Sequence, residues 1–263
     1  VKTLVEKDTM FMHGKKIIVS GPQDDRVIRA FNNVRFYKSD MSGKCDSLHS
    51  STKNELTQLI GKPVLWNNEN QMTGNVMHLI GNNETEKLDS LKVLNNAFII
   101  QKDSLSKNGF NQMKGQNLFG RFEENKLKEV DIIKNAESIY YIYNDKNEFV
   151  GIRKSVCSRI NLEMNENKIE TMTGYKDAES NIYPETEFPE NARKLRGFAW
   201  RGDERILSKE NIFPEEELAI DAKVQIDAKK KAIESDKPME IQKETLEYDE
   251  KNPKPKDKTV KKL

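Results

Sequence analysis

Histidines and neighbouring hydroxyl and carboxyl groups are the side chains in this sequence whose types could support catalysis or metal binding. The three histidines are His13, His49 and His78, and no two have the i, i+4 spacing or the HExxH context of a zinc site. Asp46, Ser47 and His49 lie close together, but neighbours on a strand point to alternating faces and do not form a triad without unusual geometry. P-loop, GxGxxG and GxSxG motifs are also missing. We therefore expect no enzymatic activity, no metal and no cofactor.

An arginine-rich segment contains Arg193, Arg196 and Arg201. The planar guanidinium group matches the geometry of a phosphate, so these residues are candidate contacts for a phosphorylated lipid headgroup. The alternative, which we favour, is a cap in which the arginines form local ion pairs with Asp203 and Glu204.

Two cysteines, Cys45 and Cys157, lie far apart in the sequence without a CxxC spacing or a nearby histidine cluster. Two readings stay open for them. They form a disulfide in an oxidising compartment, or they are two buried apolar thiols.

Bulk composition favours a thin, extended architecture over a thick core. Apolar residues make up 35% and charged residues 33% of the 263 residues, so hydrophobic side chains are scarce. The formal net charge of +1 gives no global signal for binding nucleic acid. No stretch approaches the roughly 20 apolar residues that span a bilayer.

An internal repeat organises the sequence. Similar segments pair as residues 31–40 with 94–103, residues 87–94 with 126–133, and residues 70–74 with 111–115. The first pair shares an Asn-Asn dipeptide, a following aliphatic residue and a closing Asp. We count about five units, beginning near residues 8, 45, 70, 111 and 153, which is enough to build a stack.

Each unit has the pattern of a short strand, a polar turn and a longer second strand. Helical heptads are missing from residues 8–183, and β-branched or aromatic residues dominate the expected strands there, which predicts an all-β fold. Apolar residues alternate along the strands, as expected where one face is buried. They form one expected apolar lining: Ile28, Val34, Phe36, Trp66, Met77, Leu79, Leu91, Val93, Ile99, Leu118, Val130, Ile132, Tyr140, Ile142, Ile160 and Leu162.

Residues 8–213 resemble the OstA/LptA-like family of periplasmic lipopolysaccharide-transport proteins, as a longer OstA-like variant. The repeated strand, turn and second strand with Asn-Asn-Val or Asn-Asn-Ala carries this resemblance. The supporting segments are DMSGKCDSL (40–48), GKPVLW (61–66), ENQMTG (69–74), NNAFI (95–99) and LRGFAWR (195–201).

The resemblance implies a repetitive antiparallel β-jelly roll of two facing twisted sheets, with acyl chains of lipopolysaccharide held in an apolar groove between them. It implies a non-enzymatic transport or bridge protein in outer-membrane biogenesis, located in the periplasm, with any signal peptide or upstream region missing from a chain that begins at Val1. Implied partners are lipopolysaccharide and either other transport proteins or a second copy, joined by strand-edge pairing.

The expected organisation is a jelly-roll domain over residues 1–213, with a cap at 184–213, followed by a charged tail at 214–263. The tail is expected to be helical or disordered, with a helix within residues 215–234. It docks on the roll or a partner, or it is a solvated spacer.

Two other functions compete with lipid transport. One is a structural or adhesive β-solenoid that binds protein or carbohydrate, since an apolar stripe usually packs simply as a core. The other is an unrecognised β-helix enzyme, which would require a cleft with convergent polar groups.

Overall fold

The computed structural model describes residues 2–5, 8–67, 69–82, 84–85, 87–124, 126–165, 168–214, 223 and 226. The chain divides into two compact units, Val1–Pro214 and Glu215–Leu263. In the second unit only Lys223 and Ile226 are described, and both are helical and exposed. The rest of the predicted tail beyond Pro214 lies outside the described residues.

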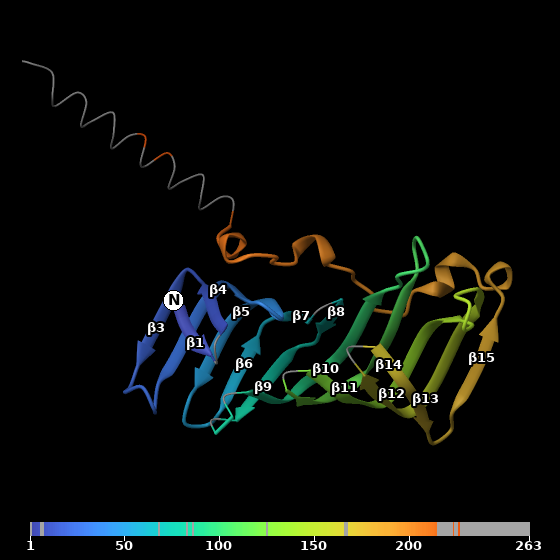
Figure 1. Cartoon of the computed structure of the whole chain (residues 1–263), viewed down its shortest axis with the longest axis horizontal. Coiled ribbons are helices and arrows are strands. Elements are labelled where there is room, and N and C mark those ends of the chain that lie inside the picture. Colours follow the sequence, from blue (N-terminus) through green and yellow to red (C-terminus); the bar gives the residue numbers. More distant parts are fainter. Residues whose placement is uncertain are drawn as a thin grey trace, which may run out of the picture. The chain divides into compact units, whose positions relative to one another are not determined.

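The first unit is an all-β jelly roll with antiparallel pairing, as the sequence predicts (Figure 1). Its strands are β1 (Lys2–Val5), β2 (Asp8–His13), β3 (Lys16–Ser20), β4 (Val27–Lys38), β5 (Met41–Ser51), β6 (Leu56–Ile60), β7 (Val64–Asn67), β8 (Asn70–Thr73), β9 (Val76–Asn82), β10 (Lys87–Lys102), β11 (Phe110–Glu123), β12 (Lys126–Tyr143), β13 (Phe149–Asn165), β14 (Lys168–Tyr175) and β15 (Glu179–Tyr183). Four 3₁₀ helices follow: η1 (Glu185–Glu187), η2 (Glu190–Arg193), η3 (Gly202–Glu204) and η4 (Lys209–Ile212).

The strands form one continuous ladder that is folded over into two facing layers. Each long strand contributes one half to each layer. In β10, residues 97–102 pair with β8 and the start of β11, whereas residues 87–94 pair with β9 and the end of β11. The strands β4, β5, β12 and β13 divide in the same way.

We call these halves the capped layer and the uncapped layer. The capped layer contains β2, β7, β8 and β15 with the adjoining halves of the long strands. The uncapped layer contains β3, β6, β9 and β14 with the other halves. Figure 1 shows the long strands passing from one layer into the other.

The fold line between the layers, here called the corner, is made by pairs of residues with positive φ. They include Asn32–Asn33 (φ 61° and 57°), Asn95–Asn96 (58° and 55°) and Lys134–Asn135 (63° and 52°). Asparagine tolerates this left-handed conformation better than most residues, because its short polar side chain bonds locally. The repeated Asn-Asn dipeptide, predicted to lie within a strand, is therefore where the strand turns sharply. The ladder register shifts at each of these pairs.

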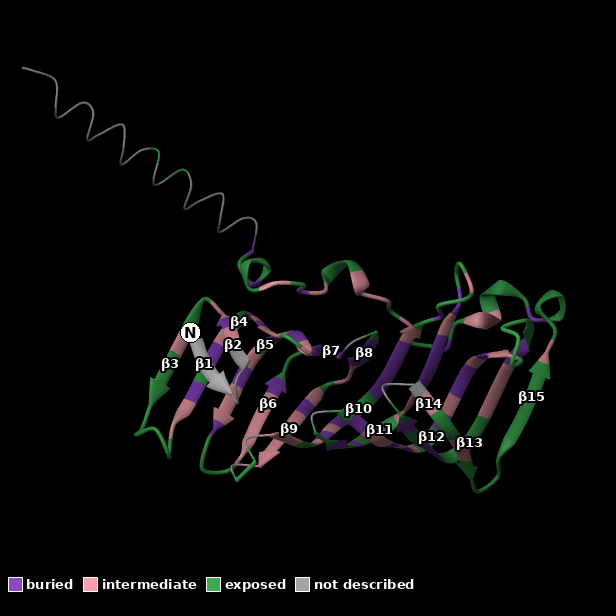
Figure 2. Ribbon diagram, viewed as in Figure 1, coloured by how far each residue is buried: buried purple, intermediate pink, exposed green. Residues whose placement is uncertain are grey.

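The apolar alternation continues across the corner. Ala30 and Val34 flank the Asn32–Asn33 pair and both are fully buried. Two inserted residues preserve the parity of the alternation, so the same face of the strand stays inward in both layers. Buried side chains of the two layers meet in one cluster that runs from β2 to β13, and partly buried residues of β14 pack against it. Figure 2 shows buried residues along the strands of both layers.

Residues 184–214, here called the strap, cross the outer face of the capped layer. Phe188 and Leu195 of the strap pack with Phe98, Ile139 and Tyr141 in a second apolar cluster. The strap end that contains η4 contacts β2 and β4. The capped layer is therefore apolar on both faces over part of its area.

Two buried glutamines attach the strap to the capped layer. Gln112 donates to the Arg193 carbonyl (2.7 Å) and accepts from the Leu195 amide (2.9 Å). Gln71 makes the same pair of bonds, to the Ala199 carbonyl (2.8 Å) and from the Arg201 amide (2.7 Å). Each side chain satisfies the strap backbone as a neighbouring strand would.

Candidate functional site

The interior between the two layers is the candidate functional site. The chain connects the two layers along one side of this interior. In the described part of the first unit, the chain passes between layers only at the corner, within the long strands and at the β2–β3, β6–β7, β8–β9 and β14–β15 connections. On the opposite side, here called the seam, each turn joins two strands of the same layer. Within the described part of the chain no strand pairing crosses the seam. The layers can therefore separate along the seam without loss of a ladder hydrogen bond.

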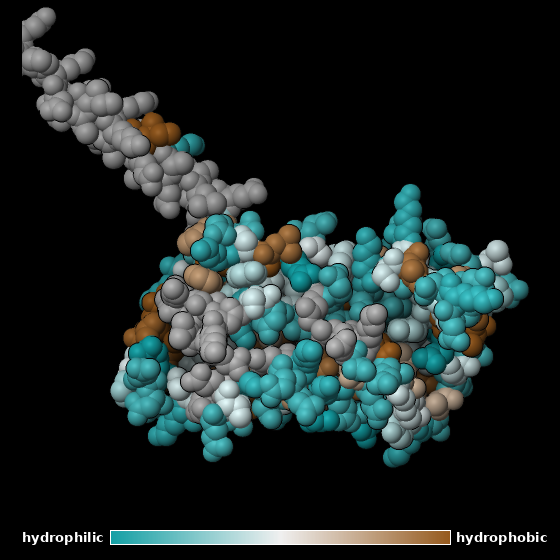
Figure 3. Space-filling view, viewed as in Figure 1, coloured by the Kyte–Doolittle hydropathy of each residue, from teal (hydrophilic) through white to brown (hydrophobic). Residues whose placement is uncertain are grey.

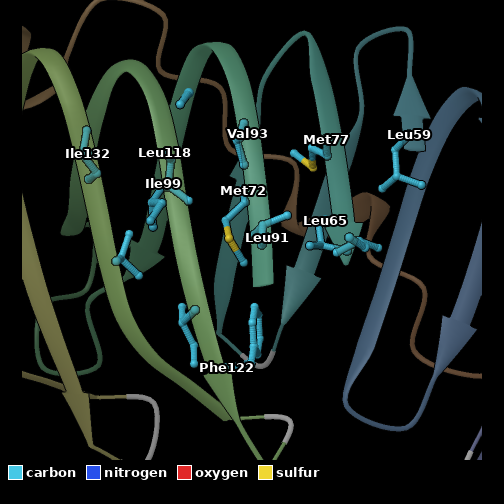
Figure 4. Packing of buried hydrophobic residues seen from close by; sticks show 14 of the residues in the cluster. Leu59, Leu65, Met72, Met77, Leu91, Val93, Ile99, Leu118, Phe122 and Ile132 are labelled. Atoms are coloured by element: carbon cyan, nitrogen blue, oxygen red, sulfur yellow. The ribbon is translucent and has the colours of Figure 1, made fainter. Parts of the chain in front are cut away.

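Most of the predicted lining residues lie together in this interior. Thirteen belong to the main buried cluster: Ile28, Val34, Phe36, Met77, Leu79, Leu91, Val93, Ile99, Leu118, Val130, Ile132, Ile160 and Leu162. Several of them point into the space between the layers in Figure 4, including Val93, Ile99 and Leu118. Tyr140 is half-buried and packs against the same cluster.

Two predicted lining residues lie outside the cluster. Trp66 is buried, but it neighbours Leu65 on β7, and Leu65 is the residue that joins the interior cluster. Alternation therefore turns Trp66 to the other face of the capped layer. Ile142 is half-buried near the end of β12 and does not join the cluster.

Sequence reasoning missed several interior residues of the capped layer, among them Leu65, Met72 and Met113. All three are nearly fully buried members of the interior cluster. Met72 and Met113 occupy matching positions in the repeated segments 70–74 and 111–115. That equivalence was the signal that would have identified them.

An inward-facing glycine on β5 makes room for an aromatic ring of the neighbouring strand β4. Gly43 pairs directly with Phe36 on the neighbouring strand. A Cβ at Gly43 would come within 2.4 Å of the Phe36 ring. The ring therefore covers the glycine, and the interior is filled by an aromatic side chain from the adjacent strand.

A small apolar cavity lies along the seam. Its volume is about 20 Å³, and its lining includes Met72, Ile99 and Met113 from the capped layer and Leu127 and Ile169 from the uncapped layer. A space of this size accepts about one water molecule. Among the described residues that line this cavity the interior is closed, and an acyl chain requires the layers to separate there.

The interior becomes polar toward β15. Arg153 lies opposite Tyr140 in the ladder, and its guanidinium carbon is 5.9 Å from the centre of that ring. Its Nη2 lies 2.8 Å from the sulfur of Met172 in the uncapped layer, while its Nε is buried without a hydrogen-bond partner. No carboxylate pairs with Arg153 among the described residues. This end of the interior therefore carries an uncompensated positive charge.

The residues first considered for catalysis are dispersed. Ser47 donates to Asp46 (2.8 Å), whereas His49 lies 3.4 Å from Gln58, whose Nε2 is 3.1 Å from His78. Burial lowers the pKa of His78. No group of three or more histidine, cysteine, aspartate or glutamate side chains suited to a metal is found among the described residues.

The predicted headgroup arginines lie on the strap and have different surroundings. Arg193 forms an ion pair with Glu185 (3.0 Å), and Arg201 makes two 2.8 Å bonds to Glu204. Hydrogen bonding to Arg201 lowers the pKa of Glu204 to about 2. Arg196 is exposed and lines a separate cleft on the outer surface.

Both cysteines are free thiols. Cys45 and Cys157 are buried, and each lies beside the corner. Burial raises the pKa of Cys45 to about 12 and also raises that of Cys157.

The protein is a jelly roll whose two layers are joined by continuous strands along one corner. No family model matches the sequence, and no curated protein matches it. Among solved structures, the chain is similar to LptH from Pseudomonas aeruginosa, described as the LptA homologous periplasmic component of the conserved lipopolysaccharide transport device. The identity is 14%, the TM-score 0.42, and the match covers 56% of this chain and 99% of that one. No described helix is long and apolar enough to cross a membrane.

Proposed function

We propose that this chain is a non-enzymatic periplasmic carrier that shields the acyl chains of lipopolysaccharide between its two layers during transport. The observation that carries the proposal is the one-sided connectivity: a continuous apolar interior is closed by covalent links at the corner and by side-chain packing at the seam. The choice of lipopolysaccharide as ligand comes from the resemblance of residues 8–213 to the OstA-like family.

An acyl chain can bind reversibly, because its contacts with the apolar lining replace contacts that the two layers make with each other. Opening the seam exposes apolar lining such as Leu118 and Ile132, and an acyl chain then covers it again. Each methylene transferred from water contributes about 0.8 kcal/mol, so a chain of about ten contributes about 8 kcal/mol. Part of this is spent on separating the layers, which keeps net affinity moderate and allows release.

The two ends of the roll suit assembly with further copies or with other transport proteins. Among the described strands, β3 at one end and β15 at the other each have one strand partner. Ile18 and Val19 on β3 and Ile182 on β15 are exposed, and apolar side chains gather at both ends of the roll in Figure 3. Strand addition at such edges would align the interiors of successive molecules.

Photocrosslinking tests the proposal with a matched pair of positions on β11. Leu118 faces the interior and is 1% exposed, whereas its neighbour Phe119 is 37% exposed. A benzoylphenylalanine at 118 should crosslink to lipopolysaccharide in detergent micelles, and the same group at 119 should not. Positions 36, 99 and 132 extend the test along the interior.

Equal labelling at 118 and 119, or no labelling at any interior position, would overturn the carrier proposal. Competition with phospholipid and fatty-acid micelles identifies the lipid class. Displacement of lipopolysaccharide by either at equal acyl concentration would contradict the assignment of lipopolysaccharide as the ligand.

A second function is favoured by the tight packing of the interior. The seam cavity of about 20 Å³ is what a purely structural core would show, and such a module would bind protein or carbohydrate on its outer surface. Hydrogen exchange distinguishes the two functions. A carrier should gain protection on both sides of the seam when lipid is added, whereas a structural module should show no change there.

A further inference from the structure

An open polar cleft lies on the outer surface of the capped layer, between the corner and the strap. Its volume is about 750 Å³, within the range of sites that hold small ligands. The corner residues Asn95, Asn96 and Asn135 form one wall, and Arg196 and Gly197 of the strap contribute to another. This cleft is separate from the apolar interior, because Lys114 and Glu137 of its lining lie on the outer face of β11 and β12.

Positive charge is concentrated in the cleft. Its lining contains Lys114, Lys134 and Arg196 and one carboxylate, Glu137, so three cations and one anion give a net charge of +2. The entire chain nets only +1. Lys114 and Glu137 neutralise each other in an ion pair of 2.8 Å.

The other two cations have no carboxylate partner. No ion pair of Lys134 or Arg196 exists among the described residues, although Arg193 and Arg201 on the same strap are both paired. The strap and the corner thus place two uncompensated charges on one cleft. A compact dianion suits that arrangement, and the guanidinium group fits phosphate oxygens in particular.

Neutral polar groups complete the lining. Thr73, Asn95, Gln116 and Asn135 line the cleft, and their side chains make no hydrogen bond to any residue that the structure describes. An amide both donates and accepts, as does a sugar hydroxyl, so these groups match a polyol. Nearby Ala97 and Phe98 add a small apolar floor.

We propose that this cleft binds a phosphorylated sugar, with Lys134 and Arg196 on the phosphate and the corner amides on the hydroxyls. The site is independent of lipid carriage between the layers. The ligand is either a soluble sugar phosphate or the phosphorylated sugar of a glycolipid, since both present the same chemistry.

The test uses the intact chain and its amide NMR spectrum. Gly115 and Gly197 line the cleft, and their amide signals are the reporters. Glucose 6-phosphate, glucose and inorganic phosphate are titrated singly, and lipopolysaccharide micelles form a parallel arm. We expect glucose 6-phosphate to shift both glycine signals at least about fivefold more strongly, at equal concentration, than glucose or phosphate does.

Two of the variants replace a lysine at the corner by asparagine. Lys134→Asn removes one charge. Asparagine already stands at the equivalent positions along the corner, Asn32 and Asn95, so the positive φ of 63° at position 134 is retained at low cost. Combined with Arg196→Gln, it should weaken binding about tenfold or more. Lys62→Asn is the matched control, because Lys62 also lies at the corner with a positive φ of 51° but outside the cleft.

Each result is decisive. Shifts by glucose 6-phosphate that the double variant loses and the control retains support a soluble ligand. The same pattern with lipopolysaccharide alone supports a glycolipid source. The proposal is overturned if neither arm shifts the cleft signals, if the double variant binds as the parent does, or if Lys62→Asn weakens binding equally.

Discussion

Replacement of Gln112 by methionine should release the strap from the capped layer. Gln112 is 1% exposed and supplies the acceptor for the Leu195 amide and a donor to the Arg193 carbonyl. Methionine has a similar length but no comparable donor or acceptor. An unpartnered buried polar group costs about 1–3 kcal/mol. Leu195 is buried whereas Arg193 is half-buried, so we expect one full penalty and part of another, about 2–4 kcal/mol.

The cost cannot exceed the free energy that holds the strap in place. Where it does reach that limit, the strap detaches and the roll remains folded. Urea unfolding measures the loss of unfolding free energy while the strap stays attached. Limited trypsin cleavage within residues 193–205 measures detachment of the strap. Gln116→Met is the matched control, because Gln116 lies on the same strand but is exposed, and its side chain makes no hydrogen bond to the described residues.

The reasoning is refuted if Gln112→Met matches Gln116→Met, within about 0.5 kcal/mol in unfolding free energy and with equal cleavage rates. The glutamine bonds would then be replaced by water at no net cost.

Three further predictions concern the core, the thiols and pH. Leu118→Ala, at a site 1% exposed, should destabilise the roll by about 3 kcal/mol in urea unfolding, because it removes buried methylenes and leaves a cavity. Cys45 and Cys157, both buried with raised pKa, should resist iodoacetamide in the folded protein at pH 8 and react once urea unfolds it; rapid native labelling would contradict their burial. The pKa of Glu204 falls from 4.5 to about 2 through its hydrogen bond with Arg201. This stabilisation is present above pH 4.5 and is lost as pH falls toward 2, so hydrogen exchange in the strap should rise across that window, and Glu204→Gln should remove the dependence.

The all-β architecture and the identity of most interior residues follow from the sequence alone. Alternation needs only local information, since successive side chains of a strand face opposite ways whatever the partner strand is. Val93 and Leu118 could therefore be assigned to one lining before any pairing was known. The repeat likewise marks equivalent positions, as the shared Asn-Asn of residues 32–33 and 95–96 shows.

The role of that dipeptide needed the tertiary structure. Asparagine is compatible with a strand end, a turn or a left-handed bend, and its local preference does not distinguish them. Pairing of each long strand with different neighbours on the two sides of the bend makes Asn95–Asn96 a corner. Trp66 illustrates the same limit, because the short strand β7 gives too few residues for its inward face to be assigned by pattern.

The outer cleft was decided by tertiary contacts, whereas part of the ion pairing of the strap could be expected from the sequence. The sequence marks Arg193, Arg196 and Arg201 as one basic segment with Asp203 and Glu204 beside it, and Arg201 does pair with Glu204. Arg193 pairs with Glu185, which is also nearby in the chain, and only the path of the strap over the capped layer leaves Arg196 beside the corner. The cleft brings Arg196 close to Lys134 and Asn135, which are remote from it in the chain, and local sequence carries no information on that approach. The period-two alternation in the sequence thus determined which side chains face the interior. The packing of segments far apart in the chain decided which charged and polar groups meet in the outer cleft.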